Sequence, residues 1–168
     1  RISGKVEFGP RRTSVQASWR EPWMFDLPWS LTLSGFYSQR EIRVGSIGVA
    51  TQEEEASYDQ DTVGGSVQVG HRPSPNWGHY HAVSTEFSQA SNPSSLVSDH
   101  IFSLVNRGWQ TKNTLTNGIY YDNRDNVFNT TEGYRAEFSA DIAGNFMGGQ
   151  SHYNRYNPKI KYYWWLFD

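Results

Sequence analysis

Two short segments of the sequence carry side chains of the types that bind metal ions. His79 and His81 are two residues apart, so on a β-strand both side chains point to the same face. The segment D-N-R-D at 122–125 places two carboxylates around an arginine. It lacks the spaced third carboxylate and the distal glutamate of a calcium loop. His71 lies across a predicted turn, so the histidines have no third ligand at the spacing of a zinc site. We therefore expect no bound metal.

The sequence shows no arrangement of residues typical of a catalytic site. No pair of carboxylates has a spacing that favours acid–base catalysis, and no serine stands in a nucleophile elbow. Three consecutive glutamates at 53–55 lie in a predicted loop, where acidic side chains are normally solvated. The chain has no cysteine, which excludes a disulfide scaffold and a thiolate metal site. We therefore predict a protein that is not an enzyme and has no cofactor.

The clearest pattern follows Gly133, where apolar and polar residues alternate without interruption. One face of this predicted strand carries Tyr134, Ala136, Phe138, Ala140 and Ile142, and the other carries Arg135, Glu137, Ser139 and Asp141. Successive strand side chains point to opposite faces, so the strand has one apolar and one charged face. A soluble sheet shows this pattern too, but a membrane barrel requires it on every strand.

The rest of the chain repeats the strand pattern, and no window carries a convincing helical stripe. We predict eight strands, at 2–8, 14–20, 29–40, 62–71, 79–89, 111–121, 134–143 and 153–167. The facing of 79–89 is ambiguous. An even number of strands, several about ten residues long, is typical of an outer-membrane barrel.

The predicted connections alternate in length. Three are short and rich in Pro, Gly and Asn, at 23–28, 73–78 and 126–133, and between them lie two long polar loops, at 41–61 and 90–110. Outer-membrane barrels have short periplasmic turns and longer extracellular loops. Trp and Tyr also gather near the predicted strand ends, as in interfacial aromatic girdles. These features together favour a barrel over a sandwich.

The composition is compatible with a barrel, and it shows no excess of basic residues that would indicate binding to nucleic acid. The 168 residues carry a net charge of −2, and 19% are charged against 15% aromatic. Mean hydropathy is −0.70, but alternating barrel strands average out as polar, so this value does not exclude a membrane protein. No apolar stretch approaches the roughly 20 residues of a spanning helix. Because no signal peptide or initiating methionine appears at Arg1, we interpret the chain as a segment of a larger protein.

The two faces of the strands have different predicted surroundings. An arginine or lysine facing lipid costs roughly 2–4 kcal/mol at the bilayer midplane. Charged residues are therefore predicted to line a hydrated lumen, and Arg135, Glu137 and Asp141 are the main candidates. The residues predicted to face lipid are Leu31, Leu33, Val67, Val69, Phe138 and Ile142.

Three segments resemble one known family. Y-D-N-R-D-N-V-F-N-T-T-E-G-Y-R, at 121–135, resembles the Y-D-x-R-D signature of BamA-type outer-membrane assembly proteins, although Val127 and Thr130 stand where prolines are usual. R-E-P-W-M-F-D-L-P-W-S-L-T-L at 20–33, with F-Y and Glu41 following, resembles a second segment of the same barrel. A-G-N-F-M-G-G and Y-N-P-K-I-K-Y-Y, within 143–163, resemble a third. The three occur in the family's order and span most of the chain.

The resemblance implies an all-β, antiparallel transmembrane barrel of about sixteen strands. Residues 1–168 would be a single barrel segment, matching roughly strands three to ten, with neither POTRA-type repeats nor the C-terminal closing strands. The implied function is the folding and insertion of β-barrel proteins into the bacterial outer membrane. The implied partners are outer-membrane lipid, substrate β-barrel proteins and accessory assembly lipoproteins, without nucleic acid.

Within the signature, Tyr121, Asp122, Arg124, Asp125 and Gly133 are predicted to form a strand end and a periplasmic turn. Opposite charges would fix it by charge-assisted hydrogen bonds, and the glycine would adopt a positive φ. Alternatively, the turn orients the barrel against N-terminal repeats.

Three alternatives remain for the whole chain. One is a stand-alone eight-stranded outer-membrane barrel acting as an adhesin or structural protein. Another is a soluble, aromatic-rich β-sandwich that binds carbohydrate. The third is a TamA-like or organellar relative.

Overall fold

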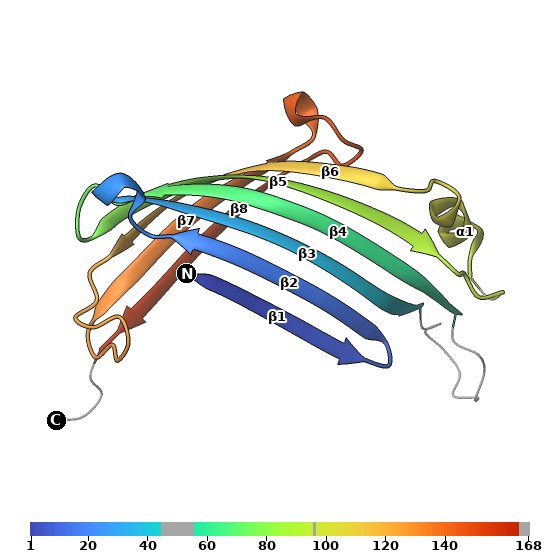
Figure 1. The fold of residues 1–168 in the computed structure, drawn as a ribbon, viewed down its shortest axis with the longest axis horizontal. Helices are drawn as coiled ribbons and strands as arrows, with labels where there is room; N and C mark the ends of the chain where they lie inside the picture. The colour runs from blue at the N-terminus through green and yellow to red at the C-terminus, as the bar shows by residue number, and fades with distance from the viewer. Residues whose placement is uncertain (45–55, 96, 165–168) are drawn as a thin grey trace.

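The computed structural model describes residues 1–44, 56–95 and 97–164. Its strands are β1 (Ile2–Gly9), β2 (Arg12–Glu21), β3 (Trp29–Val44), β4 (Ala56–His71), β5 (Trp77–Ser91), β6 (Gln110–Asp122), β7 (Gly133–Ala143) and β8 (Tyr153–Tyr163). Its helices are η1 (Met24–Asp26), α1 (Asp99–Val105) and η2 (Asn145–Met147). The strands form one strongly curved sheet (Figure 1).

Every strand pairs in antiparallel fashion with the next one along the chain, in the order β1 to β8. Over the part of the chain that the structure describes, β1 and β8 are the two edges and do not pair with each other. Within residues 1–44, 56–95 and 97–164, the strands therefore form one open sheet, which is neither a closed eight-stranded barrel nor a two-sheet sandwich. All eight predicted strands are present in the structure, and the antiparallel all-β class is confirmed.

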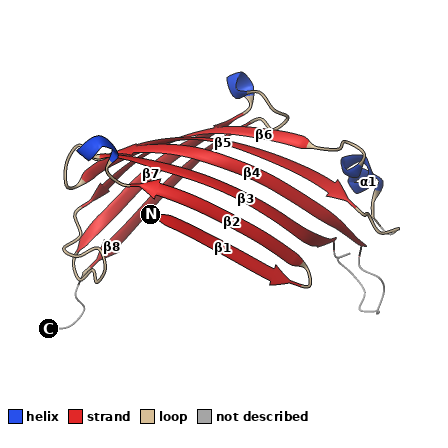
Figure 2. Ribbon diagram, viewed as in Figure 1, coloured by secondary structure: helices blue, strands red, loops and turns tan. Residues whose placement is uncertain are grey.

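The connections lie at two opposite ends of the sheet, but their lengths do not separate the two ends as predicted, because the short connection at 10–11 lies at the same end as 92–109. Segments 22–28, 72–76 and 123–132 join strand pairs at one end, which we call the turn end. The opposite end, called the loop end, carries the connections at 10–11, 92–109 and 144–152. Figure 2 shows that the three helices belong to connections at the strand ends. None of the helices in the described ranges is long and apolar enough to cross a membrane.

Several predicted boundaries are wrong at the loop end. β3 continues to Val44 and β4 begins at Ala56, so much of the predicted loop 41–61 is strand. In this region the paired strands are held by hydrogen bonds between polar side chains, and apolar and polar residues do not alternate. For example, the Arg40 guanidinium donates to Gln60 Oε1 at 2.8 Å. The predicted irregular loop 90–110 contains α1, which at seven residues is too short to show a helical period. Glu53–Glu55 and the predicted strand end at 167 lie outside the described residues.

The two faces of the sheet have opposite chemistry. One cavity is lined by side chains from five different strands: Arg20, Gln68, Tyr80, Tyr120 and Glu137. The face that carries these side chains is therefore the inside of the curve. We call it the concave face and its opposite the convex face. Ala143 is the only fully buried apolar side chain recorded within the described ranges. The sheet therefore has no apolar core of its own, and its apolar side chains lie on the uncovered convex face.

Two glycines let tyrosine rings lie flat against the concave face. Gly78 pairs with Tyr120, and Tyr80 pairs with Gly118, on the adjacent strands β5 and β6. A Cβ atom built at either glycine would overlap the ring of its partner tyrosine. Glycine is required because the backbone of one strand forms the surface on which the neighbour's ring rests. The ring of Tyr80 thereby reaches across β6 to Glu137 on β7, with an Oη to Oε1 distance of 3.1 Å.

We expect Gly118→Ala to lower the free energy of unfolding by about 1–3 kcal/mol, since the methyl group must displace the Tyr80 ring. Gly35→Ala is the matched control, because a Cβ there would lie 3.8 Å from its nearest neighbour, the Gly64 carbonyl oxygen. Denaturant titration of both variants in detergent measures the difference. Equal midpoints for the two variants would contradict this packing.

Candidate functional site

The convex face is continuously apolar across its middle. One row of paired residues follows the register from β2 to β7: Trp19, Leu33, Val67, Val83, Leu115 and Ile142. Leu33, Val67 and Val83 are 39%, 49% and 45% exposed. Leu31 and Val69 lie on the same face in the neighbouring row, and Phe138 lies one row farther toward the turn end. The structure thus places all six residues predicted to face lipid on one surface that no other part of the described chain covers.

Aromatic rings mark the turn end of the convex face. Trp77 contacts Tyr121 with ring centroids 5.0 Å apart, and Tyr121 contacts Tyr134 at 5.4 Å. Tyr134 in turn pairs with Tyr162 on β8. Amphipathic rings in this position, between an apolar band and polar turns, are typical of a membrane interface.

The concave face carries a connected polar network near the turn end. The Arg135 guanidinium donates to Asp122 Oδ2 at 3.5 Å and to Glu137 Oε2 at 3.3 Å, and it lies over the Tyr120 ring. Glu137 also accepts the hydroxyl of Tyr80. Each carboxylate therefore has a partner of opposite charge, which offsets its loss of solvation.

Asp141 lies farther from the turn end, on the same concave face. Only 6% of the residue is exposed. Its carboxylate accepts hydrogen bonds from Thr116 Oγ1 at 2.7 Å, Arg155 Nε at 2.9 Å and Asn157 Nδ2 at 3.3 Å. Arg135, Glu137 and Asp141, which were predicted to face a lumen, thus share one face. Their assignment to a water-filled lumen stays a prediction.

The signature segment folds into the β6–β7 connection and its two strand ends. Arg124 donates through Nε and Nη2 to the two oxygens of Asp122, both at 2.8 Å. Tyr121 is on the convex face and Asp122 on the concave face, so the signature residues do not converge on one point. Asp125 instead accepts bonds from the far side of the turn, at Thr131 and Glu132.

The carboxylate of Asp125 holds the turn closed. Hydrogen bonds from the Thr131 hydroxyl and from the backbone amides of Thr131, Asn126 and Glu132 lower the pKa of Asp125 to about 2. The unperturbed value is about 3.9. Because the folded-state pKa is the lower one, this contribution to stability is present above about pH 3.9 and is lost as the pH falls through about 2.

We therefore expect the amide proton signal of Thr131 to titrate with a midpoint near pH 2 in the folded protein, measured by NMR in detergent micelles. Asp125→Asn should abolish that titration, because the amide side chain has no ionisable group. A midpoint near pH 3.9 in the unmodified protein would show that the bonds do not persist in solution.

A cavity of about 690 Å³ opens on the concave face beside the turn end. Its lining includes Arg20, Arg72, Arg124 and Arg135 together with Asp122 and Glu137. Within the residues described, no group of three or more His, Cys, Asp or Glu side chains is arranged to hold a metal ion. The cavity is thus an open space lined by side chains of both charges.

Sequence reasoning missed one cluster on the convex face. The short 72–76 connection brings His71, at the end of β4, opposite His79 on β5. His79 and His81 share that face, as their spacing predicts. The short turn between the two strands could have revealed this cluster from the sequence. A short hairpin connection fixes which residues of its two strands are paired.

Comparison with curated proteins gives no match. A family model described as the Omp85 superfamily domain matches residues 1–168. This superfamily is associated with the bacterial outer membrane or its organellar equivalents, and membership suggests outer-membrane protein biogenesis or transport. The exposed apolar face, the polar concave face and the antiparallel order of the sheet agree with that match. The chain belongs to the Omp85 superfamily.

Proposed function

We propose that the protein is a BamA-type assembly factor that folds and inserts β-barrel proteins into the bacterial outer membrane. The observation that carries the proposal is the signature at 121–135, which forms a closed turn between two amphipathic strands within an Omp85-type sheet. Two further segments resemble the same family in the same order. Together they favour the assembly branch over other members of the superfamily.

In this proposal the chain supplies part of the wall of a larger barrel. The edges of β1 and β8 pair with further strands, to a total of about sixteen, since an open strand edge is a ready pairing surface. The convex face contacts lipid and the concave face lines a hydrated lumen. The turn end faces the periplasm, where Asp122 and Arg124 hold the β6–β7 connection.

The proposed activity requires no nucleotide, cofactor or covalent step. Insertion would combine local destabilisation of the bilayer with templating of incoming strands by hydrogen bonding to an open strand edge. The partners would be membrane lipid, unfolded β-barrel substrates and accessory lipoproteins. The described strands form a continuous ladder, so we assign them the rigid wall rather than the moving part.

The direct test is an insertion assay with the purified protein in liposomes. A urea-denatured β-barrel substrate is added, and its conversion to a protease-resistant folded form is followed over time. We expect several-fold faster conversion than in liposomes of the same lipid that hold an unrelated barrel. Equal rates would contradict the proposal. Passage of a soluble passenger protein into the lumen, without insertion, would assign the chain to the transport branch instead.

A further inference from the structure

Two arginines on the concave face have no carboxylate partner in the part of the chain that the structure describes. Arg20 is the last residue but one of β2, and its side chain has no recorded hydrogen bond or ion pair with any described residue. Arg72 directly follows β4, and its guanidinium donates to the Pro75 carbonyl oxygen. Both side chains are exposed. A guanidinium has five N–H donors, so most of the donors on these two side chains are free to bind a ligand.

Arg20 and Arg72 lie where two cavities of the sheet meet. The cavity of about 690 Å³ and a second cavity of about 230 Å³ share five lining residues, which are Arg20, Gln68, Arg72, Tyr80 and Tyr120. We call the space bordered by these five residues the arginine hollow. Both guanidiniums therefore face one site, although they come from different strands.

The other charged side chains of the two cavities compensate each other in pairs. Arg124 donates to both oxygens of Asp122 at 2.8 Å, and Arg135 donates to Glu137 Oε2 at 3.3 Å. Asp122 and Glu137 are the carboxylates among the lining residues of either cavity. Four arginines stand against these two carboxylates, so with neutral histidines the lining has a net charge of +2. This excess charge belongs to the two unpaired arginines.

Neutral hydrogen-bond donors border the same hollow. The side-chain amide of Gln68 and the hydroxyl of Tyr120 are half-buried, and neither has a recorded hydrogen bond with a described residue. Thr32 on β3 pairs with Arg20 on one side and with Gln68 on the other. The side chains of Arg20 and Gln68 thus flank a short, uncharged side chain, which leaves space between them for a ligand.

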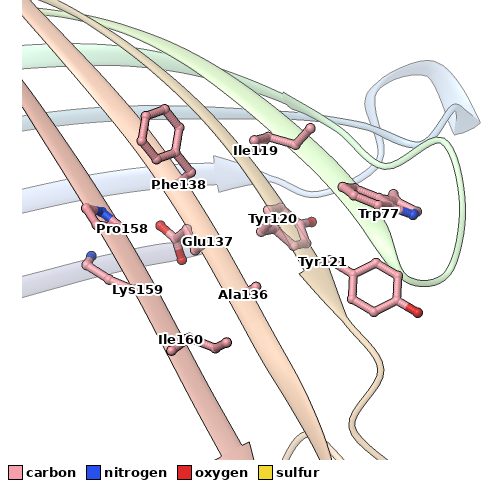
Figure 3. A pocket seen from close by; sticks show the side chains of 10 residues that line it. All are labelled: Trp77, Ile119, Tyr120, Tyr121, Ala136, Glu137, Phe138, Pro158, Lys159 and Ile160. Carbon is pink, nitrogen blue, oxygen red and sulfur yellow. The ribbon is translucent and has the colours of Figure 1, made fainter.

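The arginine hollow lies on the side of the sheet opposite the apolar surface. Figure 3, which looks onto an apolar pocket of the convex face, shows Tyr120 and Glu137 on the other side of β6 and β7 from Ile119 and Phe138. The ligand is therefore expected to be a polar molecule and not an acyl chain.

We propose that the arginine hollow binds a small, water-soluble phosphate monoester. This group carries close to two negative charges at neutral pH, which matches the excess charge of the lining, and it has three acceptor oxygens. Arg20 and Arg72 would contact the phosphate, because planar guanidiniums bind phosphate oxygens in pairs, and Gln68 would donate to a third oxygen. The inference does not rest on the proposed function, since neither lipid contact nor a substrate protein takes part.

The test is isothermal titration calorimetry of the purified protein in non-ionic detergent, at low ionic strength to limit screening. Glucose 6-phosphate and glucose 6-sulfate share the sugar, but at about pH 7.5 they carry about two negative charges and one. We expect the phosphate ester to bind at least about fivefold more tightly, because one more unit charge close to a guanidinium contributes about this factor even in water. Glucose alone should give no heat of binding.

Four variants locate the site. Arg20→Gln and Arg72→Gln should each weaken the binding of glucose 6-phosphate by about fivefold. Arg107→Gln, in the 92–109 connection at the loop end, changes the net charge equally and should bind as the unmodified protein does. Gln68→Glu retains both arginines and places a carboxylate beside them, so it should also abolish the preference for phosphate. It therefore tests the site even if an arginine variant fails to fold.

Several results would overturn the phosphate site. These are equal affinities for the two esters, or unchanged binding of glucose 6-phosphate in both Arg20→Gln and Gln68→Glu. Retention of dioleoylphosphatidic acid that glucose 6-phosphate does not displace would assign the arginines to a lipid headgroup. Tighter binding of hexaglutamate than of glucose 6-phosphate would assign them to an acidic polypeptide. The liposome insertion assay is independent, because failure of insertion with intact phosphate binding contradicts only the proposed function.

Discussion

Val67→Arg is expected to lower the free energy of unfolding in a lipid bilayer by about 2–4 kcal/mol. Val67 lies on the convex face of β4, four residues before the last residue of that strand, His71, and is 49% exposed. If that exposed surface contacts hydrocarbon, the guanidinium loses its hydration on folding. Partial relief would come only from snorkelling toward an interface.

Gln68→Arg is the matched control, one residue along the same strand. Its side chain borders the charged cavity on the concave face, which is lined by four arginines as well as by Asp122 and Glu137. Because that cavity is open to water, which screens the new charge from the arginines, we expect a cost below about 1 kcal/mol. Urea titration of both variants in liposomes gives the comparison. Equal costs, or a larger cost at Gln68, would contradict the assignment of the two faces.

Gly133→Ala is expected to destabilise the protein by about 2–4 kcal/mol, through two separate effects. Gly133 has a φ of +106°, which an L residue with a Cβ atom rarely adopts. A Cβ atom there would also lie 2.7 Å from the Asn123 carbonyl oxygen and 2.8 Å from the Arg124 Cα. Both contacts are with backbone, so relief requires the signature turn itself to move.

Gly108→Ala isolates the first of these effects. Gly108 has a φ of +65°, but nothing lies within 4 Å of a Cβ atom built there. We expect a cost of about 1 kcal/mol from backbone strain alone. Thermal or denaturant unfolding of the two variants measures the difference. If Gly133→Ala costs no more than Gly108→Ala, the close approach of Gly133 to Asn123 does not hold in solution.

The strands were predictable from sequence because their signal is local. In 134–142 each apolar residue is followed by a polar one, and that period alone fixes both the strand and its two faces. The same rule failed at the ends of β3 and β4. There, pairs such as Arg40 and Gln60 bond across strands, and a polar run looks like a loop when its partner is unknown.

The candidate sites depend on pairing, which a single sequence specifies poorly. His71 and His79 are eight residues apart, and only the register of the β4–β5 hairpin makes them neighbours. Tyr80 and Glu137 are 57 residues apart and meet because Gly118 lets the ring cross β6. In contrast, Asp122 and Arg124 are two residues apart, and the expected charge-assisted bond between them is present in the structure.

In the proposed function, the convex face contacts lipid and the concave face contacts water. The chain contains no cysteine, so Phe138→Cys and Glu137→Cys each provide a single site in it for a nitroxide spin label. Electron paramagnetic resonance in liposomes then compares relaxation by oxygen, which concentrates in lipid, with relaxation by a water-soluble nickel complex. We predict that oxygen dominates at 138 and nickel at 137. Nickel dominating at both positions would contradict the account and leave the apolar face to be covered by protein instead.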